Sequence, residues 1–289
     1  MILASGTASR LPRPSATLPL LAALALAVPG AGHAAEEAPL PVLDRFRLSA
    51  GVFSVNHELA GRWDSGSGRL GTPFDFQRDL GFSPRLRTPF WILGAGFGRE
   101  RQWQVDLFHF ETDDDASRTL ERTFELGDDS YQAGARFTGS LDTTMSGASL
   151  SWFFHRAPAS AFGVGLGVID YRLRSQLDAT IAVQDRIVEV SSGFDEQAWA
   201  PMLRGEYVRR LGDRWRMAAT AAYISADLDN VSGRVLDAHV RFDYFPTERI
   251  GLTLRYALNS VDVNLHRDSY EGKVRLHSHG PQLFTTLRF

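Results

Sequence analysis

The chain has 289 residues, no cysteine and a formal net charge of −3 at pH 7. The near-neutral charge argues against a nucleic-acid partner, and the lack of cysteine means that disulfide bonds do not stabilise the fold. After the first 34 residues, no stretch approaches the ~18 continuous apolar residues of a transmembrane helix. After residue 34 the chain is therefore expected to fold without disulfide bonds and without membrane-spanning helices.

The first forty residues have the layout of a secretory signal peptide. Arg10 and Arg13 precede a short apolar core at 18–28, and the small residues Gly32 and Ala34 stand at positions −3 and −1 of a cleavage site. The apolar core is shorter than the ~20 residues that a membrane-spanning helix needs. We therefore predict a signal peptide over 1–34, a short periplasmic N-terminal lead over 35–43 and a barrel domain over 44–289.

The rest of the chain alternates apolar and polar residues with period two, which indicates strands rather than helices. From Ile250 to Leu258, for example, every second residue is large and apolar. Short turns separate these runs on one side, and longer polar segments separate them on the other, which is typical of outer-membrane barrels. We predict an all-β fold: a single antiparallel transmembrane β-barrel of about ten strands, with eight or twelve as alternatives, short periplasmic turns and long extracellular hairpins.

Matching apolar residues across each hairpin predicts the strand register, because residues directly opposite each other share a face. The predicted pairs are Ile250 with Leu287, Trp215 with Tyr244, Trp103 with Phe154, and Val164 with Tyr207. The register of the first hairpin, about 44–60 with 87–98, stays open because its long loop does not fix it. Segments 113–143 and 175–197 are expected to continue as β-ribbons to tips at 127–129 and 184–186.

The apolar face of the strands is predicted to meet lipid. Large aromatic residues lie on it near both strand ends, as in the aromatic girdles of membrane barrels. Those near the short turns are Trp103, Phe154, Trp215, Tyr244 and Phe289, and those near the other end are Trp91, Trp199 and Tyr223. The opposite face would line the lumen with the charged residues Asp106, Arg204, Glu206, Arg216, His239, Arg241, Asp243, Arg249, Arg255 and Arg288.

Three functions are compatible with this lumen. Paired charges that fill a narrow bore would leave a structural or surface-interaction role, whereas unpaired arginines around water would give a small anion-leaning channel. A hydrolase with a rim active site would need His109, Asp262, His266, His277 or His279 to converge with a nucleophile. Strand parity turns His109, His277 and His279 outward, so we favour the filled lumen and expect no enzyme, metal or cofactor.

Two acidic clusters lie in the long segments, at 113–115 and 128–129. Acidic residues at loop tips are ordinarily solvated surface charges. The alternative is that they bridge to lipopolysaccharide phosphates through Ca²⁺ or Mg²⁺, which prefer carboxylate oxygens.

The predicted mature chain as a whole resembles bacterial outer-membrane β-barrel proteins. The resemblance rests on the signal peptide, about ten amphipathic strands and a last strand, 280–289, that ends in Phe289. It implies the outer membrane of a Gram-negative bacterium, contact with lipid and lipopolysaccharide, and periplasmic chaperones and a barrel-assembly machinery that reads Phe289. The segment from Asp75 to Phe82 is similar to one in an uncharacterised proteobacterial group, which implies no activity.

Overall fold

The computed structural model describes residues 40–65, 67–68, 70–126, 129–183, 186–228, 231–267 and 270–289. The predicted signal peptide, residues 35–39 and the loop-tip residues Gly127, Asp128, Gln184 and Asp185 lie outside this described part. Within it, no helix is both long enough and apolar enough to cross a membrane.

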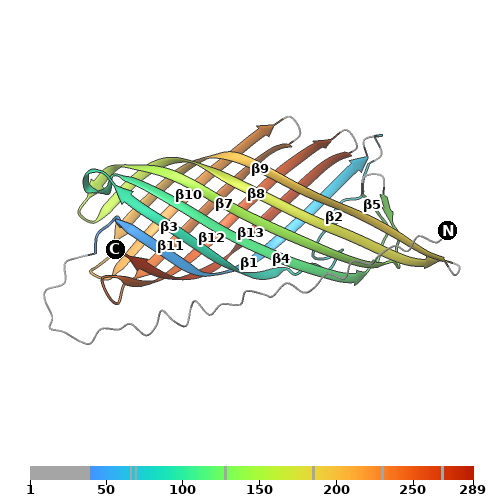
Figure 1. Ribbon diagram of the computed structural model, residues 1–289, viewed down its shortest axis with the longest axis horizontal. Coiled ribbons are helices and arrows are strands. Elements are labelled where there is room, and N and C mark those ends of the chain that lie inside the picture. The colour runs from blue at the N-terminus through green and yellow to red at the C-terminus, as the bar shows by residue number, and fades with distance from the viewer. Residues whose placement is uncertain are drawn as a thin grey trace, which may run out of the picture. The chain divides into compact units, whose positions relative to one another are not determined.

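Ten long antiparallel strands close into one barrel, because the last strand pairs with the first (Figure 1). They are β1 (Phe46–Ser65), β3 (Arg85–Phe97), β4 (Trp103–Thr119), β7 (Arg136–Ala157), β8 (Ser160–Val183), β9 (Arg186–Arg210), β10 (Trp215–Leu228), β11 (Val231–Tyr244), β12 (Ile250–Arg267) and β13 (Tyr270–Arg288). The fold class and the predicted strand number are confirmed. Three short strands and one 3-10 turn complete the fold: β2 (Phe74–Asp75), β5 (Phe124–Leu126), β6 (Asp129–Tyr131) and η2 (Arg99–Arg101).

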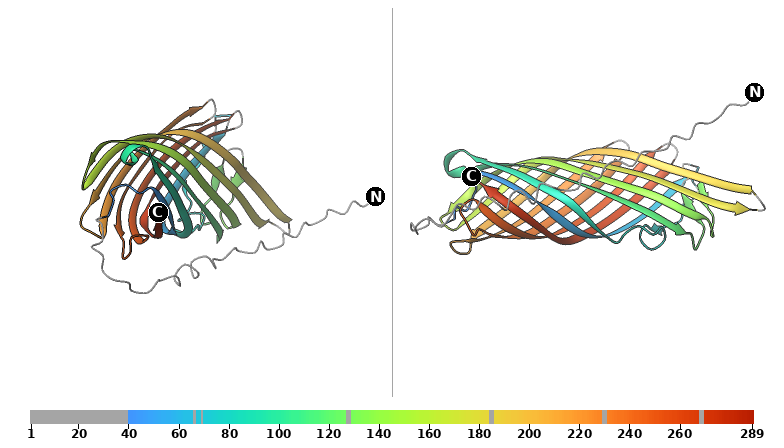
Figure 2. Two further views of the ribbon diagram at one scale, coloured as in Figure 1. Left: turned by 60° about the vertical axis from the view of Figure 1, so that its left-hand side comes forward. Right: turned by 60° about the horizontal axis from the view of Figure 1, so that its bottom comes forward.

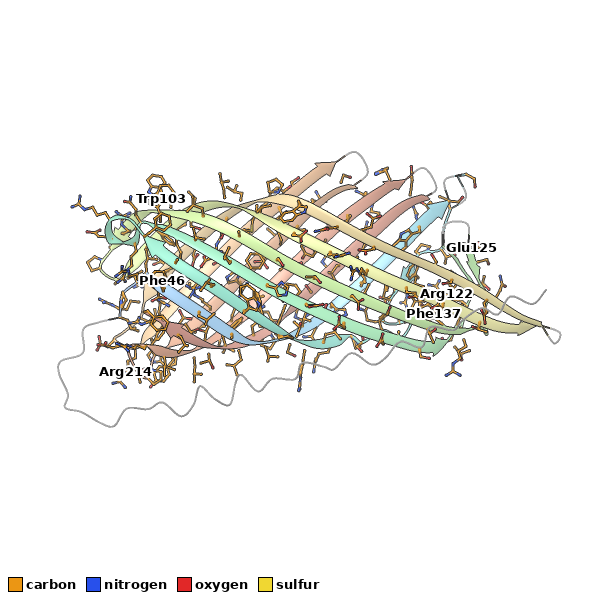
Figure 3. All side chains as sticks on the ribbon, viewed as in Figure 1. Phe46, Trp103, Arg122, Glu125, Phe137 and Arg214 are labelled. Atoms are coloured by element: carbon orange, nitrogen blue, oxygen red, sulfur yellow. The ribbon has the colours of Figure 1, made fainter. Side chains whose placement is uncertain are left out.

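The two ends of the barrel differ. One end, the turn end, carries the short connections and both termini of the barrel, where the backbone N–H groups of Phe46 and Phe289 donate to each other's carbonyl oxygens at 3.1 and 3.0 Å. Figure 3 shows Phe46, Trp103 and Arg214 there, with Phe137 toward the opposite, loop end. The strands β8 and β9 project furthest at the loop end (Figure 2), because they have 24 and 25 residues where about 10 suffice to cross a bilayer.

Two of the four predicted registers are confirmed: Ile250 pairs with Leu287 and Trp215 pairs with Tyr244. The other two are wrong by two residues, because Trp103 pairs with Trp152 and Val164 pairs with Gly205. A shift of two residues keeps every side chain on its face, so apolar matching alone does not penalise it. His109 therefore lies opposite Ser146.

The predicted ribbons have different outcomes. The β8–β9 ladder continues without a break to Val183 and Arg186, as predicted. The β4–β7 ladder instead ends at Thr119 and Arg136, and the chain between them forms the separate β5–β6 hairpin. The ladder stops there because Leu120, which is 2% exposed, turns into an apolar cluster rather than continuing into water.

The outer face is apolar only in the half of the barrel next to the turn end. Along β12, Leu252, Leu254 and Leu258 point outward and are about half exposed. The nine residues from Ile250 to Leu258 span roughly 21 Å of barrel height, at ~3.4 Å per residue and a tilt near ~40°. Above Leu258 the pattern inverts: Val261 points inward and is buried, while Asp262 is partly exposed.

Candidate functional site

Nine buried or nearly buried charged side chains form a continuous network inside the barrel at the turn end. Each arginine in it contacts at least one carboxylate within 4 Å, and positive and negative side chains alternate across six strands and the N-terminal segment. In order, they run Arg47, Asp106, Arg204, Glu206, Arg241, Asp243, Arg216, Asp44 and Arg288, from β1, β4, β9, β10, β11, β13 and the N-terminal segment. We call this set the charged network.

The tightest contacts of the charged network centre on Arg216, whose side chain is 1% exposed. Its Nη1 and Nη2 donate to the two carboxylate oxygens of Asp44 at 2.9 and 2.7 Å, and its Nε donates to Asp243 at 2.9 Å. Its guanidinium also lies over the ring of Phe245, 5.2 Å from the centroid. Bidentate pairs of this geometry are among the strongest hydrogen bonds in proteins, and they hold both partners in one orientation.

Residues 40–44, here called the strap, lie inside the turn end of the barrel. Leu43 packs against the inward side chains of Phe153, Val208 and Ala218, all of which are almost fully buried. The carbonyl oxygen of Leu40 accepts a hydrogen bond from Arg210 at 3.2 Å. The lead that the sequence places in the periplasm therefore fills the bore, at least from residue 40 onward.

Three more polar residues lie above the charged network. Nδ1 of His239 is 2.8 Å from a guanidinium nitrogen of Arg255 and 3.3 Å from a carboxylate oxygen of Asp237. One ring nitrogen cannot accept from Arg255 and donate to Asp237 at once. Because the guanidinium always carries its protons, we assign Nδ1 as the acceptor for Arg255, which makes His239 neutral.

Above Arg255 the barrel encloses a cavity of about 250 Å³ with mainly apolar walls. The charged side chains predicted to line the lumen are therefore followed, toward the loop end, by a mainly apolar section of the bore. The upper part of the cavity lies above Leu258, where the outer face is polar, so apolar residues there are buried only by pointing inward. Its apolar lining includes Phe53, Val55, Phe90, Phe110, Met145, Ile224, Val261 and Leu276. Its polar floor includes Arg255 and Gln282, and the carboxylates of Asp114, Glu196 and Asp237 also line the cavity.

Residues 72–83, here called the cap, cover part of the loop end and contain the segment singled out in the sequence. Phe74, Phe76 and Phe82 are at most 5% exposed and pack against inward residues of β1, β7, β8 and β13. Asp75 and Asp79 fold the turn, since the side chain of Asp75 accepts from the N–H of Arg78 at 2.7 Å and the side chain of Asp79 accepts from the N–H of Asp75 at 2.8 Å.

Two further features fix the cap. Gly81 has φ +86°, a left-handed conformation that favours glycine, and a Cβ there would approach Cβ of Arg118 to 3.2 Å. Asp79 also accepts from Arg122 at 2.7 Å. Burial would raise the pKa of Asp79, but the N–H of Asp75 and the guanidinium of Arg122 lower it below its ordinary value.

Nine of the ten lumen residues predicted from the sequence lie inside the barrel, in the charged network or directly above it: Asp106, Arg204, Glu206, Arg216, His239, Arg241, Asp243, Arg255 and Arg288. The prediction for Arg249 is wrong, because this residue is exposed in the turn before β12. Sequence reasoning missed Arg47, which is inward on β1, and Asp44, which precedes the first strand. Phe289 is 70% exposed at the turn end.

The hydrolase candidates do not converge. His109 contacts Ser146 at 2.8 Å on the outside of β4 and β7, while His277 and His279 contact Ser260 and Tyr256 on β12. Asp262 lies within 3.8 Å of two arginines, Arg234 and Arg275. His266 is exposed near the end of β12.

The acidic cluster at 113–115 is divided between the two faces of β4. Asp114 is 7% exposed and accepts from the N–H of Ser83 at 2.8 Å, so it is not a solvated loop charge. Asp113 and Asp115 point outward beside Asp142, and burial together with these two carboxylates raises the pKa of Asp142 above its ordinary value. Within the described residues, no group of three or more histidine, aspartate or glutamate side chains forms a candidate metal site.

Comparison with known proteins places the fold. No protein-family model and no curated protein sequence matches the chain. Among solved structures, the outer membrane protease OmpT from Escherichia coli is similar over 88% of this chain and 99% of its own, with a TM-score of 0.57 and 10% identity. The transport unit of the autotransporter AIDA-I from Escherichia coli has a TM-score of 0.40 at 8% identity, covering 84% of this chain and 89% of that one.

The chain therefore has the fold of the bacterial outer-membrane β-barrel proteins. At an identity of 10%, the likeness to OmpT shows the fold alone. Protease activity is a property of OmpT, and the likeness does not bring it to this chain.

Proposed function

We propose that the protein is an integral outer-membrane barrel of a Gram-negative bacterium, exported by the signal peptide at 1–34, with a structural or surface-interaction role. The apolar outer belt supports membrane insertion, since its height of roughly 21 Å is close to the ~25 Å apolar band of outer-membrane barrels. Aromatic side chains lie at both edges of the belt, with Trp215 and Phe154 toward the turn end and Trp199 and Tyr223 toward the loop end. The turn end then faces the periplasm and the loop end faces the exterior.

We further propose that this barrel does not conduct ions. The observation that carries this proposal is the charged network together with the strap, which cross the bore at the turn end. Arg216, Asp243 and Asp106 are each at most 2% exposed, and Arg47 on β1 reaches Asp106 on β4 at 3.0 Å. A bore filled by paired side chains leaves no file of water for an ion, in contrast to the wider barrels of porins.

Planar-bilayer recording on detergent-folded protein tests the closed lumen. We expect a heat-sensitive shift on an unboiled gel, which shows that the barrel is folded, and no stable conductance steps. A variant that lacks residues 35–44 is the matched control, because it removes the strap and Asp44 and should produce openings. Stable steps in the unaltered protein would contradict the closed lumen, and a change of ion preference in Arg255→Glu would then support the anion-leaning channel.

We propose no enzymatic activity. The support is geometric, because His109, His277 and His279 each contact a different hydroxyl on the outer surface. Among the residues that the structure describes, no third side chain hydrogen-bonds to any of these imidazoles. A nucleophile, a base and an orienting group must meet in one cleft to form a hydrolytic site. Lipid contact, lipopolysaccharide contact and recognition of Phe289 by the assembly machinery remain predictions from the resemblance.

A further inference from the structure

The charged layer inside the barrel carries one more positive than negative charge. Among the described residues, the arginines of this layer are Arg47, Arg204, Arg216, Arg241, Arg255 and Arg288, and the carboxylates are Asp44, Asp106, Glu206, Asp237 and Asp243. Six arginines against five carboxylates, with His239 neutral, leave one uncompensated charge. Burying such a charge is costly unless a counter-charge or hydrogen bonds compensate it.

Five of these arginines and four of these carboxylates form the charged network, and the remaining two groups, Arg255 and Asp237, both contact Nδ1 of His239. Arg255 differs from the five arginines of the charged network, because within the described residues no carboxylate oxygen comes within 4 Å of it. Its contacts are Nδ1 of His239 at 2.8 Å and the ring of Phe90, whose centroid lies 5.6 Å from the guanidinium carbon. Neither partner carries a negative charge, and Arg255 is only 9% exposed.

Arg255 and Gln282 also present unpaired polar atoms at the cavity floor. Nε of Arg255 and Oε1 of Gln282 are buried and have no hydrogen-bond partner, and both residues line the cavity. They lie directly opposite each other on β12 and β13. Buried polar groups in native proteins are nearly always hydrogen-bonded, so two unpaired groups at one place indicate a missing partner.

The cavity above this floor extends along the barrel axis. Its lining on β12 continues from Arg255 through Ala257 and Val261 to Val263, which corresponds to roughly 20 Å along the barrel axis at the strand rise and tilt used above. A mainly apolar lining of that length suits an extended hydrocarbon chain. The strap and the charged network close the lower end, so a ligand would reach the cavity from the loop end.

We propose that this cavity binds an amphiphile composed of a carboxylate and an unbranched hydrocarbon chain, with the carboxylate on Arg255 and Gln282 and the hydrocarbon along the apolar walls. The carboxylate accepts from the unpaired Nε of Arg255 and gives this guanidinium the carboxylate partner within hydrogen-bond distance that it otherwise lacks. The amide of Gln282 contributes a donor after rotation about its last bond. This inference goes beyond the proposed closed lumen, and its test does not depend on conductance.

Isothermal titration calorimetry on the protein in phosphatidylcholine nanodiscs, with empty nanodiscs subtracted, tests the assignment. The probes are octanoate, octylammonium and octanol at pH 7.5, which share one hydrocarbon chain and differ in the charge of the headgroup. We expect octanoate to bind at least ten-fold more tightly than octylammonium, with octanol between them. Equal binding of octanoate and octylammonium, or no binding of any probe, would overturn the proposal.

Three variants locate the site, after an unboiled gel has shown that each is folded. Arg255→Gln should remove the preference for octanoate over octanol, whereas Arg249→Gln, which changes an exposed arginine at the turn end, should keep it. Ala257→Phe should weaken octanoate and octanol alike, because Ala257 is 3% exposed and lines the cavity. Unchanged binding in Ala257→Phe would place the probes on the outer surface and refute the cavity. If Arg255→Gln does not fold, Gln282→Leu replaces it, with a several-fold loss of octanoate expected.

Discussion

The substitution Asp44→Asn tests how far the strap depends on one buried ion pair. Asparagine keeps the size of the side chain but removes the charge that receives two hydrogen bonds from Arg216, at 2.9 and 2.7 Å. Breaking a buried pair by removing one partner costs about 3–5 kcal/mol. Because Arg216 keeps Asp243 at 2.9 Å, we expect a loss near the lower bound, about 3 kcal/mol, which is roughly a hundred-fold change in an equilibrium constant.

Equilibrium unfolding in urea, followed by the heat-sensitive gel shift in lipid vesicles, measures this loss. Asp213→Asn is the matched control, since Asp213 is exposed in a short turn at the same end. The double variant Asp44→Asn, Arg216→Met should lose less than the sum of the two single variants, because it leaves no unpaired charge. A loss for Asp44→Asn below about 1 kcal/mol would refute the reasoning, because exposed ion pairs already reach that value.

Two further predictions concern the outer belt and the cap. Leu254→Arg places a charge in the middle of the lipid-facing belt and should cost about 2–4 kcal/mol of folding free energy in vesicles, whereas Leu70→Arg, in an exposed loop, should cost almost nothing; equal costs would contradict the orientation. The pKa of Asp79 is lowered in the fold, so its contribution is present above the unfolded pKa near 4 and is lost as the pH falls through the folded pKa. Hydrogen exchange of residues 74–82, corrected for intrinsic rates, should therefore become faster below about pH 4. The variant Asp79→Asn should show this faster exchange already at pH 6. Exchange that does not depend on pH in the unaltered protein would argue against this role of Asp79.

The sequence predicted the barrel, its ten strands and most of the inward charges, because alternation with period two decides which face each side chain takes. It did not decide the register of β4–β7 and β8–β9, since a shift of two residues leaves the faces unchanged. The β7–β8 pairing contains an irregularity between Phe153 and His155, and its position is not visible in the apolar pattern. The prediction that Arg249 points inward was wrong because β12 starts at Ile250, the residue after it.

The apolar cavity was missed although the sequence contains a signal for it. In β12 the large apolar residues occupy even positions up to Leu258 and odd positions at Val261 and Val263. Residues 252–265 of β12 pair with residues 231–244 of β11 in one unbroken register, so a bulge does not cause the change in parity. It marks the height at which the solvent outside the barrel changes from lipid to water, and apolar side chains then turn inward.

The strap and the cap were outside the reach of period-two reasoning, because neither is a barrel strand. Leu43 and Asp44 belong to a short segment in which polar and apolar residues follow no regular period. Their contacts can be seen only in the folded barrel, where the strap lies inside the bore. The cap was noticed through its resemblance, but its role depends on Phe76 and Phe82 meeting residues of strands distant in sequence.

The change of parity also limits how deeply the barrel sits in its bilayer. Below the boundary the outer surface is hydrocarbon-like, and above it charged side chains such as Arg172 and Asp195 pair on the outside at 2.9 Å. If the barrel moved deeper into the bilayer, these ions would lose water. If it moved outward, the aromatic side chains at the edge of the apolar belt would be exposed to water. Displacement along the membrane normal is therefore opposed in both directions. In a thicker membrane the lipid, rather than the protein, would have to adapt by thinning locally. Sterol-rich bilayers should therefore accept this barrel less readily than the thin outer membrane does.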